Sequence, residues 1–277
     1  MLSNHEALAP AMLPVWIEPA RHENGTPSDK FHLVRVRFGA DDASIVDVGA
    51  VSGKYHFVSN SDIINCVDAV ADRFRLDFEP GKPRAARLTK NGHSRMLLHA
   101  PAYSYRVPGD PSDIIPMLAI DNGYDGGTPV RFTSGGWRYS CQNLLLWFGE
   151  IASSEKRIHK GNWSLEQFVC DGLEALREKI DADRQIAEVL TRVDPDPALV
   201  VALYEATPER YRLKFTAAVE RYRAEIGRNA WSIVQAASEI VSHTMLRKGQ
   251  DTWSSDVWMR NMVNSVLESD AVVAARK

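Results

Sequence analysis

The sequence lacks the features that mark a secreted or membrane-spanning protein. It has only three cysteines, Cys66, Cys141 and Cys170, and no Cys-x-x-Cys pair. An odd number of dispersed cysteines is typical of free thiols in a reducing compartment, and it argues against a disulfide framework. No apolar run approaches the roughly 20 residues that a membrane-spanning helix needs. The first residues also lack the basic and apolar regions of a secretory signal. We therefore expect a cytoplasmic protein without membrane contact.

An excess of one charge and the common catalytic motifs are also missing. The formal net charge is −3, which excludes a cationic coat over the whole protein but allows a local basic patch. There is no P-loop, no Gly-x-Gly-x-x-Gly and no Gly-x-Ser-x-Gly motif. The eight histidines show no metal-ligand spacing. We expect neither a metal nor another cofactor, and no specific hydrolase or transferase is indicated.

The sequence is organised around a glycine-containing stretch, residues 120–148. Two of its features are the pairs Gly126-Gly127 and Gly135-Gly136, which predict a turn and a bend because glycine tolerates backbone conformations that other residues avoid. The apolar run Asn143–Phe148 that follows predicts the start of an interior helix.

Periodicity predicts an α+β protein in which an N-terminal antiparallel sheet with helices is followed by an all-helical C-terminal region. Residues 1–30 are aperiodic and rich in proline, which indicates an arm without regular structure. Alternating runs in residues 31–160 indicate an α+β core domain, and helical spacing indicates a helical domain over residues 161–277. Within the core domain, Ser59–Asp62 predicts a helix start, and Asn91-Gly92 predicts a hairpin turn.

The clearest anomaly of charge is the run from Pro80 to Gly109, which contains no Asp or Glu. A basic hairpin with aromatic residues is suited to nucleic acid, because cations contact phosphates and rings stack on bases. The structural alternative is an edge hairpin whose Lys and Arg side chains prevent aggregation between sheets. The predicted nucleic-acid-binding residues are the cations and two tyrosines of this run: Lys82, Arg84, Arg87, Lys90, Arg95, Tyr103, Tyr105 and Arg106.

Two other groups of residues admit a chemical interpretation beside a structural one. Cys141 precedes an apolar run, where a thiol is either an activated nucleophile or, more often, a buried core group. Asp121, Asp125 and Arg138 form either a polar cluster or parts of turns and ion pairs. An enzyme with a site near Asp125, Arg138 and Cys141 is therefore an alternative hypothesis, although the sequence favours a protein without catalysis.

The tryptophans of the helical half also have two interpretations. Trp231, Trp253 and Trp258 lie among apolar residues at helical spacing, which is typical of a core. Aromatic residues are also enriched in subunit interfaces, so the same pattern is compatible with an oligomer.

Three segments together resemble the phage- and plasmid-borne domain-of-unknown-function 932 family. The segments are Tyr55–Asp62, Asp121–Gly127 and Arg138–Leu144, and the Arg-x-x-Cys-Gln-Asn part of the third is the most specific. Gly127 and Leu144 depart from the Ser and Thr that are usual in the family. The positions that match its pattern are Asp121, Asn122, Asp125, Gly126, Arg138, Cys141, Gln142 and Asn143.

This resemblance implies a phage, plasmid or other mobile-element setting, and no catalytic residue is carried over from it. The order of helix, three strands with a basic hairpin, and helix is also similar to the single-strand annealing proteins of phages, which implies a homo-oligomer. The leading hypothesis is a protein that binds nucleic acid, in particular single-stranded DNA during recombination or replication. The alternative is an anti-defence or other interaction factor that binds a host protein complex.

Overall fold

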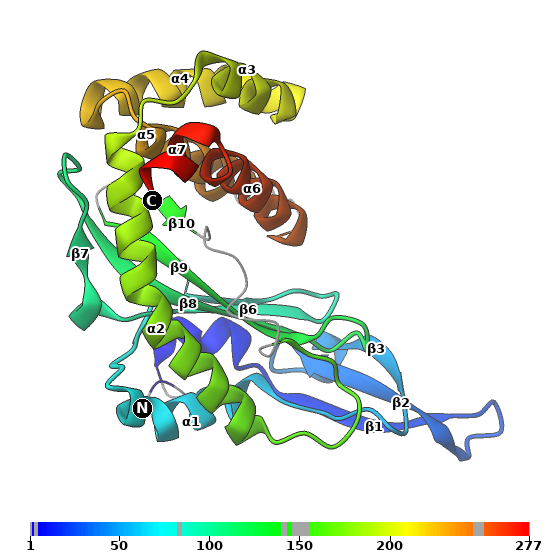
Figure 1. Ribbon diagram of the computed structural model, residues 1–277. Helices are drawn as coiled ribbons and strands as arrows, with labels where there is room; N and C mark the ends of the chain where they lie inside the picture. Colours follow the sequence, from blue (N-terminus) through cyan, green and yellow to red (C-terminus); the bar gives the residue numbers. More distant parts are fainter. Residues whose placement is uncertain are drawn as a thin grey trace. The chain divides into compact units, whose positions relative to one another are not determined.

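The computed structural model describes residues 2, 5–81, 85–139, 143–145, 156–245 and 252–276. It shows the predicted α+β class, with antiparallel sheets in the N-terminal part and helices in the C-terminal part (Figure 1). The chain divides into two compact units. Unit 1 comprises Met1–Ala100, Leu118–Thr133 and Glu150–Arg177, and unit 2 comprises Pro101–Met117, Ser134–Gly149 and Glu178–Lys277. These divisions differ from the expected boundaries at residues 30 and 160.

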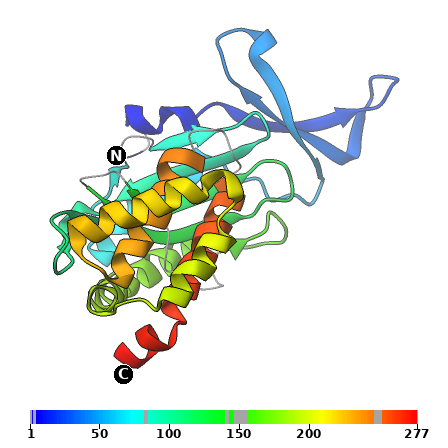
Figure 2. The same cartoon turned by 90° about the horizontal axis from the view of Figure 1, so that it is seen from above.

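The small sheet of unit 1 has the order β1-β2-β3, with β1 at Val15–Arg21, β2 at Pro27–Arg37 and β3 at Ile45–Ser52. It lies at the far end of unit 1 from helix α1 (Figures 1 and 2). Val15 pairs with Val36 and Ile17 with Val34, so one face of the sheet is apolar. The arm expected for residues 1–30 is therefore wrong, because residues 15–21 and 27–30 are paired strands. Proline is tolerated there since β1 is an edge strand.

The other strands of unit 1 form the main sheet. They are β4 (Glu79–Pro80), β5 (Ala86–Leu88), β6 (His93–His99), the later part of β8 (Asp113–Gly123), the first part of β9 (Val130–Arg138) and β11 (Lys156–Arg157). The order is β9-β8-β6-β4, with β5 beside β6 and β11 beside β9. The hairpin predicted at Asn91-Gly92 is confirmed, because β5 and β6 are antiparallel and Gly92 takes a φ of +77°.

Helices α1 (Asn60–Val70) and the first half of α2 (Leu165–Arg192) cover one face of this sheet. The start of α1 is as predicted, since Ser59 and Asp62 form a reciprocal capping box. The ring of Phe132 on β9 lies 4.8 Å from that of Phe168 on α2. Gly172 on α2 is needed there, because a Cβ would lie 2.3 Å from the Phe132 ring. Arg73, in the 3-10 turn Ala71–Phe74 that follows α1, pairs with Glu166 on α2 at 3.3 Å.

Unit 2 combines strands with the C-terminal helices. Its strands are β7 (Tyr105–Arg106), the first part of β8, the last part of β9, and β10 (Asn143–Leu145). Its helices are the end of α2, α3 (Pro197–Ala206), α4 (Glu209–Ile226), α5 (Ala230–Glu239), a π-helix (Ile240–Met245), α6 (Thr252–Leu267) and α7 (Asp270–Ala275). Trp231 on α5 is fully buried in this core and Trp258 packs against it, whereas the Trp253 side chain lies outside the described residues. No helix among the described residues is long and apolar enough to cross a membrane.

One local prediction in this region is wrong. The residues Asn143–Leu145 form strand β10, paired with β9 through Leu144 and Trp137, instead of the expected helix; residues 146–148 lie outside the described residues. An apolar run carries no period of its own, so pairing with β9 and packing of β10 against α5 decide its conformation.

Candidate nucleic-acid interface

Arg87 and Arg95 occupy directly opposed positions on β5 and β6. Two like charges at such a position repel each other, and a carboxylate on the neighbouring strand β8 compensates this repulsion. The Arg95 Nε and Nη2 atoms donate to the two carboxylate oxygens of Asp121 at 2.6 and 2.7 Å. The Arg95 side chain is only 9% exposed and that of Asp121 18%, so this bidentate pair is largely shielded from water.

Arg95 and Asp121 project from the face of the main sheet opposite α1. Their chain neighbours Ser94 and Asn122 both hydrogen-bond the Asn60 side chain at the start of α1. Successive residues of a strand point to opposite faces, so Arg95 and Asp121 point the other way.

The same argument places Arg131 on this face. Its neighbour Phe132 packs against α2, so Arg131 points away from the helices. Lys156 of β11 takes the register position opposite Arg131. We call Arg87, Arg95 and Arg131, with the register position of Lys156, the cationic row. Asp121 on β8 stands between its two halves, and Arg95 and Arg131 are 8% and 7% exposed.

The structure distributes the sequence-predicted residues unevenly. Arg87 is half-buried and Lys90 is exposed at the hairpin turn of unit 1, while Tyr103 is half-buried in unit 2. Lys82 and Arg84 lie outside the described residues. Arg131 and Lys156 were not among the predicted residues. A single basic residue in a strand does not indicate a basic row, because its neighbours on adjacent strands cannot be read from the sequence.

Three of the predicted residues are paired or buried in the structure. Arg95 is already bound by Asp121, so a phosphate would compete with an intact ion pair. Tyr105 in unit 2 is 9% exposed, and burial raises the pKa of its hydroxyl; its ring is not presented for stacking. Arg106 is exposed but pairs with Asp113 at 2.9 Å.

Two of the family-motif segments meet in a buried hydrogen-bond network of unit 1. The Asn122 Nδ2 atom donates to the Val58 carbonyl at 3.1 Å and to Asn60 Oδ1 at 3.0 Å. The backbone N–H of Asn60 donates to the Tyr124 hydroxyl at 2.9 Å. Because Asn60 and Asn122 are almost fully buried, these bonds replace water and fix the segment before α1 against the end of β8.

Asp125 organises the turn after β8. Its carboxylate accepts bonds from the backbone N–H groups of Gly127 and Thr128 at 3.0 and 2.8 Å and lies 2.8 Å from His93 Nε2. Partial burial alone would raise the pKa of Asp125, but the hydrogen bonds of Thr128, His93 and Gly127 lower it to about 2. The carboxylate is thus ionised and engaged, and Gly126 takes a φ of +81° beside it.

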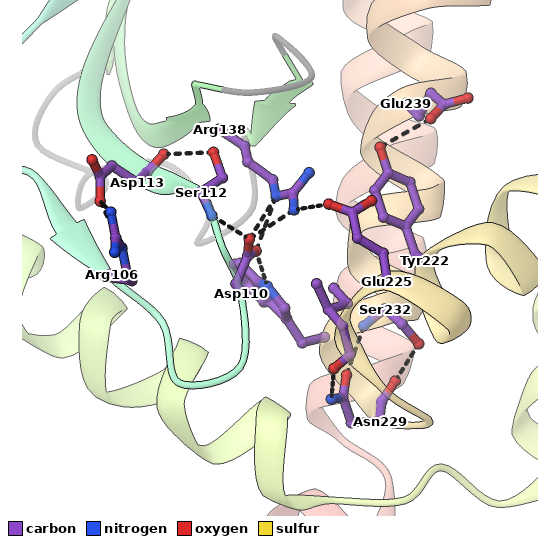
Figure 3. Close-up of polar contacts among 12 residues, drawn as sticks. Arg106, Asp110, Ser112, Asp113, Arg138, Tyr222, Glu225, Asn229, Ser232 and Glu239 are labelled. Carbon is purple, nitrogen blue, oxygen red and sulfur yellow. Dashed lines mark hydrogen bonds and ion pairs between the residues drawn. The ribbon is translucent and has the colours of Figure 1, made fainter.

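Arg138 is enclosed in a charged network of unit 2 (Figure 3). Its Nε and Nη2 atoms donate to Asp110 at 2.7–3.0 Å, and Nη2 also donates to Glu225 at 2.6 Å. The Arg138 and Asp110 side chains are 1% and 0% exposed. Trp231 Nε1 donates to Asp110 at 2.8 Å. Arg138 therefore has the structural ion-pair role that was one of its two interpretations.

The remaining motif positions say little about catalysis. Cys141 and Gln142 lie outside the described residues, and Asn143 pairs in register with Arg138. Among the part of the chain that the structure describes, no three His, Cys, Asp or Glu residues form a metal-binding group. Asp121, Asp125 and Arg138 each have their own partners, which agrees with the interpretation as parts of turns and ion pairs.

His159 is the most unusual polar group of unit 1. Its Nδ1 donates to the His56 carbonyl at 2.9 Å, and its ring stacks on Tyr55 with centroids 4.8 Å apart. Burial lowers the pKa of His159, so the ring is neutral with a lone pair on Nε2. That atom is buried and has no hydrogen-bond partner among the described residues.

The comparisons with known proteins give one family and no closer relative. The sequence model of the family described as "Domain of unknown function (DUF932)" matches residues 47–262. No curated protein matches the chain, and no solved structure does. The similarity to single-strand annealing proteins, expected from the order of elements, thus finds no support in these comparisons.

Proposed function

The chain belongs to the DUF932 family, and we propose that it binds single-stranded nucleic acid along the cationic row of unit 1 without catalysing a reaction. The row supports this proposal because Arg87, Arg95 and Arg131 lie on one face of the sheet, with the carboxylate of Asp121 bound to Arg95. A planar guanidinium is also well suited to phosphate oxygens, which it contacts through two parallel hydrogen bonds.

The dimensions of the row are compatible with a nucleic-acid backbone. It crosses β5, β6, β8, β9 and β11 in that order, and four intervals of about 4.8 Å give a length of about 19 Å. Arg87 at one end keeps part of its surface exposed, whereas Arg95 and Arg131 are almost enclosed. We therefore expect the first phosphate contacts at the Arg87 end.

The setting that we propose is DNA recombination or replication on a phage or plasmid, in the cytoplasm and by a homo-oligomer. This part rests on the family resemblance and on the order of the elements.

A salt titration tests the proposal. Binding to labelled single-stranded and double-stranded oligonucleotides is measured from low to moderate salt. Two to four phosphate contacts predict a slope of log K against log salt of about −1.5 to −3 for a single strand. Substituting Arg87→Gln or Lys156→Gln should weaken binding and flatten the slope by about 0.7 each.

The matched control is Lys214→Gln, which removes an exposed lysine of α4 and should leave the slope unchanged. Circular dichroism shows whether the Arg87 and Lys156 variants remain folded. If the wild-type protein binds neither oligonucleotide at low salt, or folded variants keep the wild-type slope, the proposal fails.

A second candidate, a protein partner, is favoured by apolar side chains on the helices of unit 2. Val201 on α3 and Leu213 on α4 are 56% and 83% exposed, and Tyr204 is 37% exposed. Large apolar residues at such exposure are one feature of interaction surfaces. A host protein that co-purifies after nuclease treatment, and is lost in Val201→Glu with Leu213→Glu, would support this candidate over the first.

A further inference from the structure

Helices α1 and α2 carry two cysteines that the proposed function does not use. Cys66 lies in α1 and Cys170 in α2, and both are free thiols with half-buried side chains. We propose that they form a redox-sensitive pair, which a peroxide converts into an intramolecular disulfide that joins the two helices. Both helices cover the face of the main sheet opposite the cationic row, so the pair has a role separate from nucleic-acid binding.

The sides of the two helices that carry these cysteines face each other. In α2, Glu166 precedes Cys170 by four residues, and residues four apart share one side of a helix. Arg73 follows Cys66 by seven residues, in the 3-10 turn that directly follows α1, so it lies about two turns further on nearly the same side. The Arg73 Nη1 and Glu166 Oε1 atoms are 3.3 Å apart, which brings the two sides together.

The electrostatic surroundings of the Cys66 thiol agree with this arrangement. Burial, the largest cause, and the nearby charges of Cys170 and Glu166 raise the pKa of the Cys66 thiol to about 11, while Arg73 opposes them. Interactions between charges weaken with distance, so an effect of Cys170 on Cys66 requires that the two sulfur atoms are neighbours. The groups around Cys66 are therefore the same ones that the ion pair joins.

The spacing of packed helices suits a disulfide between them. Helix axes pack about 8–10 Å apart, and Cα atoms lie about 2.3 Å from the axis, which leaves facing Cα atoms about 3.5–5.5 Å apart. A disulfide joins Cα atoms that are about 4.4–6.8 Å apart. Two cysteines on the facing sides of a packed helix pair therefore lie within the range of this bond.

The oxidation balances with one molecule of hydrogen peroxide. One thiolate sulfur attacks a peroxide oxygen, which breaks the O–O bond, forms a sulfenic acid and, after protonation, releases one water. The sulfur of the other cysteine then displaces the hydroxyl group of the sulfenic acid, forms the S–S bond and releases a second water. Two thiols and one peroxide thus give one disulfide and two waters, and two electrons pass from sulfur to oxygen.

The raised pKa of Cys66 determines how this pair responds. A thiol reacts as its thiolate, which is scarce near neutral pH when the pKa is about 11, so the disulfide forms slowly. A protein that stabilises its thiolate favours the reduced form. Cys66 lacks this stabilisation, so the disulfide resists reduction once it has formed. The pair is therefore suited to prolonged oxidation and not to rapid catalytic turnover.

Peroxide treatment of the whole chain, followed by digestion without reduction and mass spectrometry, tests the pairing. The peptides that contain Cys66 and Cys170 should be linked, with a mass two hydrogen atoms below their sum, and a reductant should separate them. Cys66→Ser and Cys170→Ser should each remove the link, whereas Cys141→Ser, the matched control, should retain it. The oxidised wild type should also melt about 4–16 °C higher than the reduced protein, and Cys66→Ser should show no such rise.

Four results would overturn the pairing. In the first, both thiols of the folded wild type still react with an alkylating reagent after prolonged peroxide treatment. In the second, either cysteine is linked to Cys141 or to a second molecule, the latter seen as a peroxide-dependent dimer on a non-reducing gel. In the third, one thiol is oxidised to a sulfinic acid without any link. In the fourth, the two peptides are linked but the melting temperature is unchanged, which excludes a bond that joins the folded helices.

Discussion

Replacing Arg138 by methionine should destabilise unit 2 far more than the loss of a typical ion pair. The substitution keeps a long apolar side chain but removes every bond from the guanidinium to Asp110 and Glu225. Asp110, whose side chain is 0% exposed, would retain the Trp231 Nε1 and Ser112 N–H donors. Two neutral donors do not compensate a buried carboxylate.

The expected cost follows from this burial. Removing one partner of a buried ion pair typically costs about 3–5 kcal/mol, because the other charge is left uncompensated. That is a large part of the roughly 5–15 kcal/mol that holds a typical protein folded. The additional contact of Arg138 with the Tyr222 ring, 5.6 Å away, is lost as well. We therefore expect a cost in the upper half of the range of about 3–5 kcal/mol.

Urea denaturation followed by tryptophan fluorescence measures the effect. The matched control is Arg106→Met, since Arg106 and Asp113 form an exposed pair whose loss should cost less than about 1 kcal/mol. The double variant Arg138→Met with Asp110→Asn should recover part of the stability, because no buried charge remains. If Arg138→Met costs no more than Arg106→Met, or the double variant is the least stable of all, the reasoning is wrong.

Two further predictions concern stability. Burial, opposed by Lys179, raises the pKa of Asp183 from 3.8 to about 7. The protonated carboxyl group therefore contributes to the stability of the folded state below about pH 4, and this contribution to the free energy of unfolding is lost as the pH rises through 7. Asp183→Asn should therefore stabilise the protein at pH 8, by up to about 4 kcal/mol at 1.36 kcal/mol per pKa unit, and not at pH 4; equal melting temperatures at pH 8 would contradict this. Gly172→Ala should destabilise the protein, because its Cβ would lie 2.3 Å from the Phe132 ring and such overpacking typically costs about 1–3 kcal/mol. This cost outweighs the roughly 1 kcal/mol by which alanine favours a helix over glycine; a higher melting temperature would refute the prediction.

The sequence by itself determined those features that depend on a few neighbouring residues. Ser59 and Asp62 predict the start of α1 because both partners of the capping box lie within one turn. Asn91-Gly92 predicts the β5–β6 hairpin, since glycine permits the positive φ of the turn. Alternating and helical periods likewise predicted the α+β class, and three motif segments identified the family.

The tertiary structure decided every feature that depends on residues far apart in the chain. Asp121 neutralises Arg95 from a strand 26 residues away, and Glu225 reaches Arg138 across 87 residues. The composition of residues 80–109, with many cations and no acids, could not reveal that Arg95 has a carboxylate partner outside this run. The cationic row likewise exists only because sheet register brings Arg87 beside Arg95 and Arg131 beside Lys156. The conformation of a cap or a turn depends on neighbours in sequence, whereas the ion-pair partners and the exposure of a side chain depend on neighbours in space.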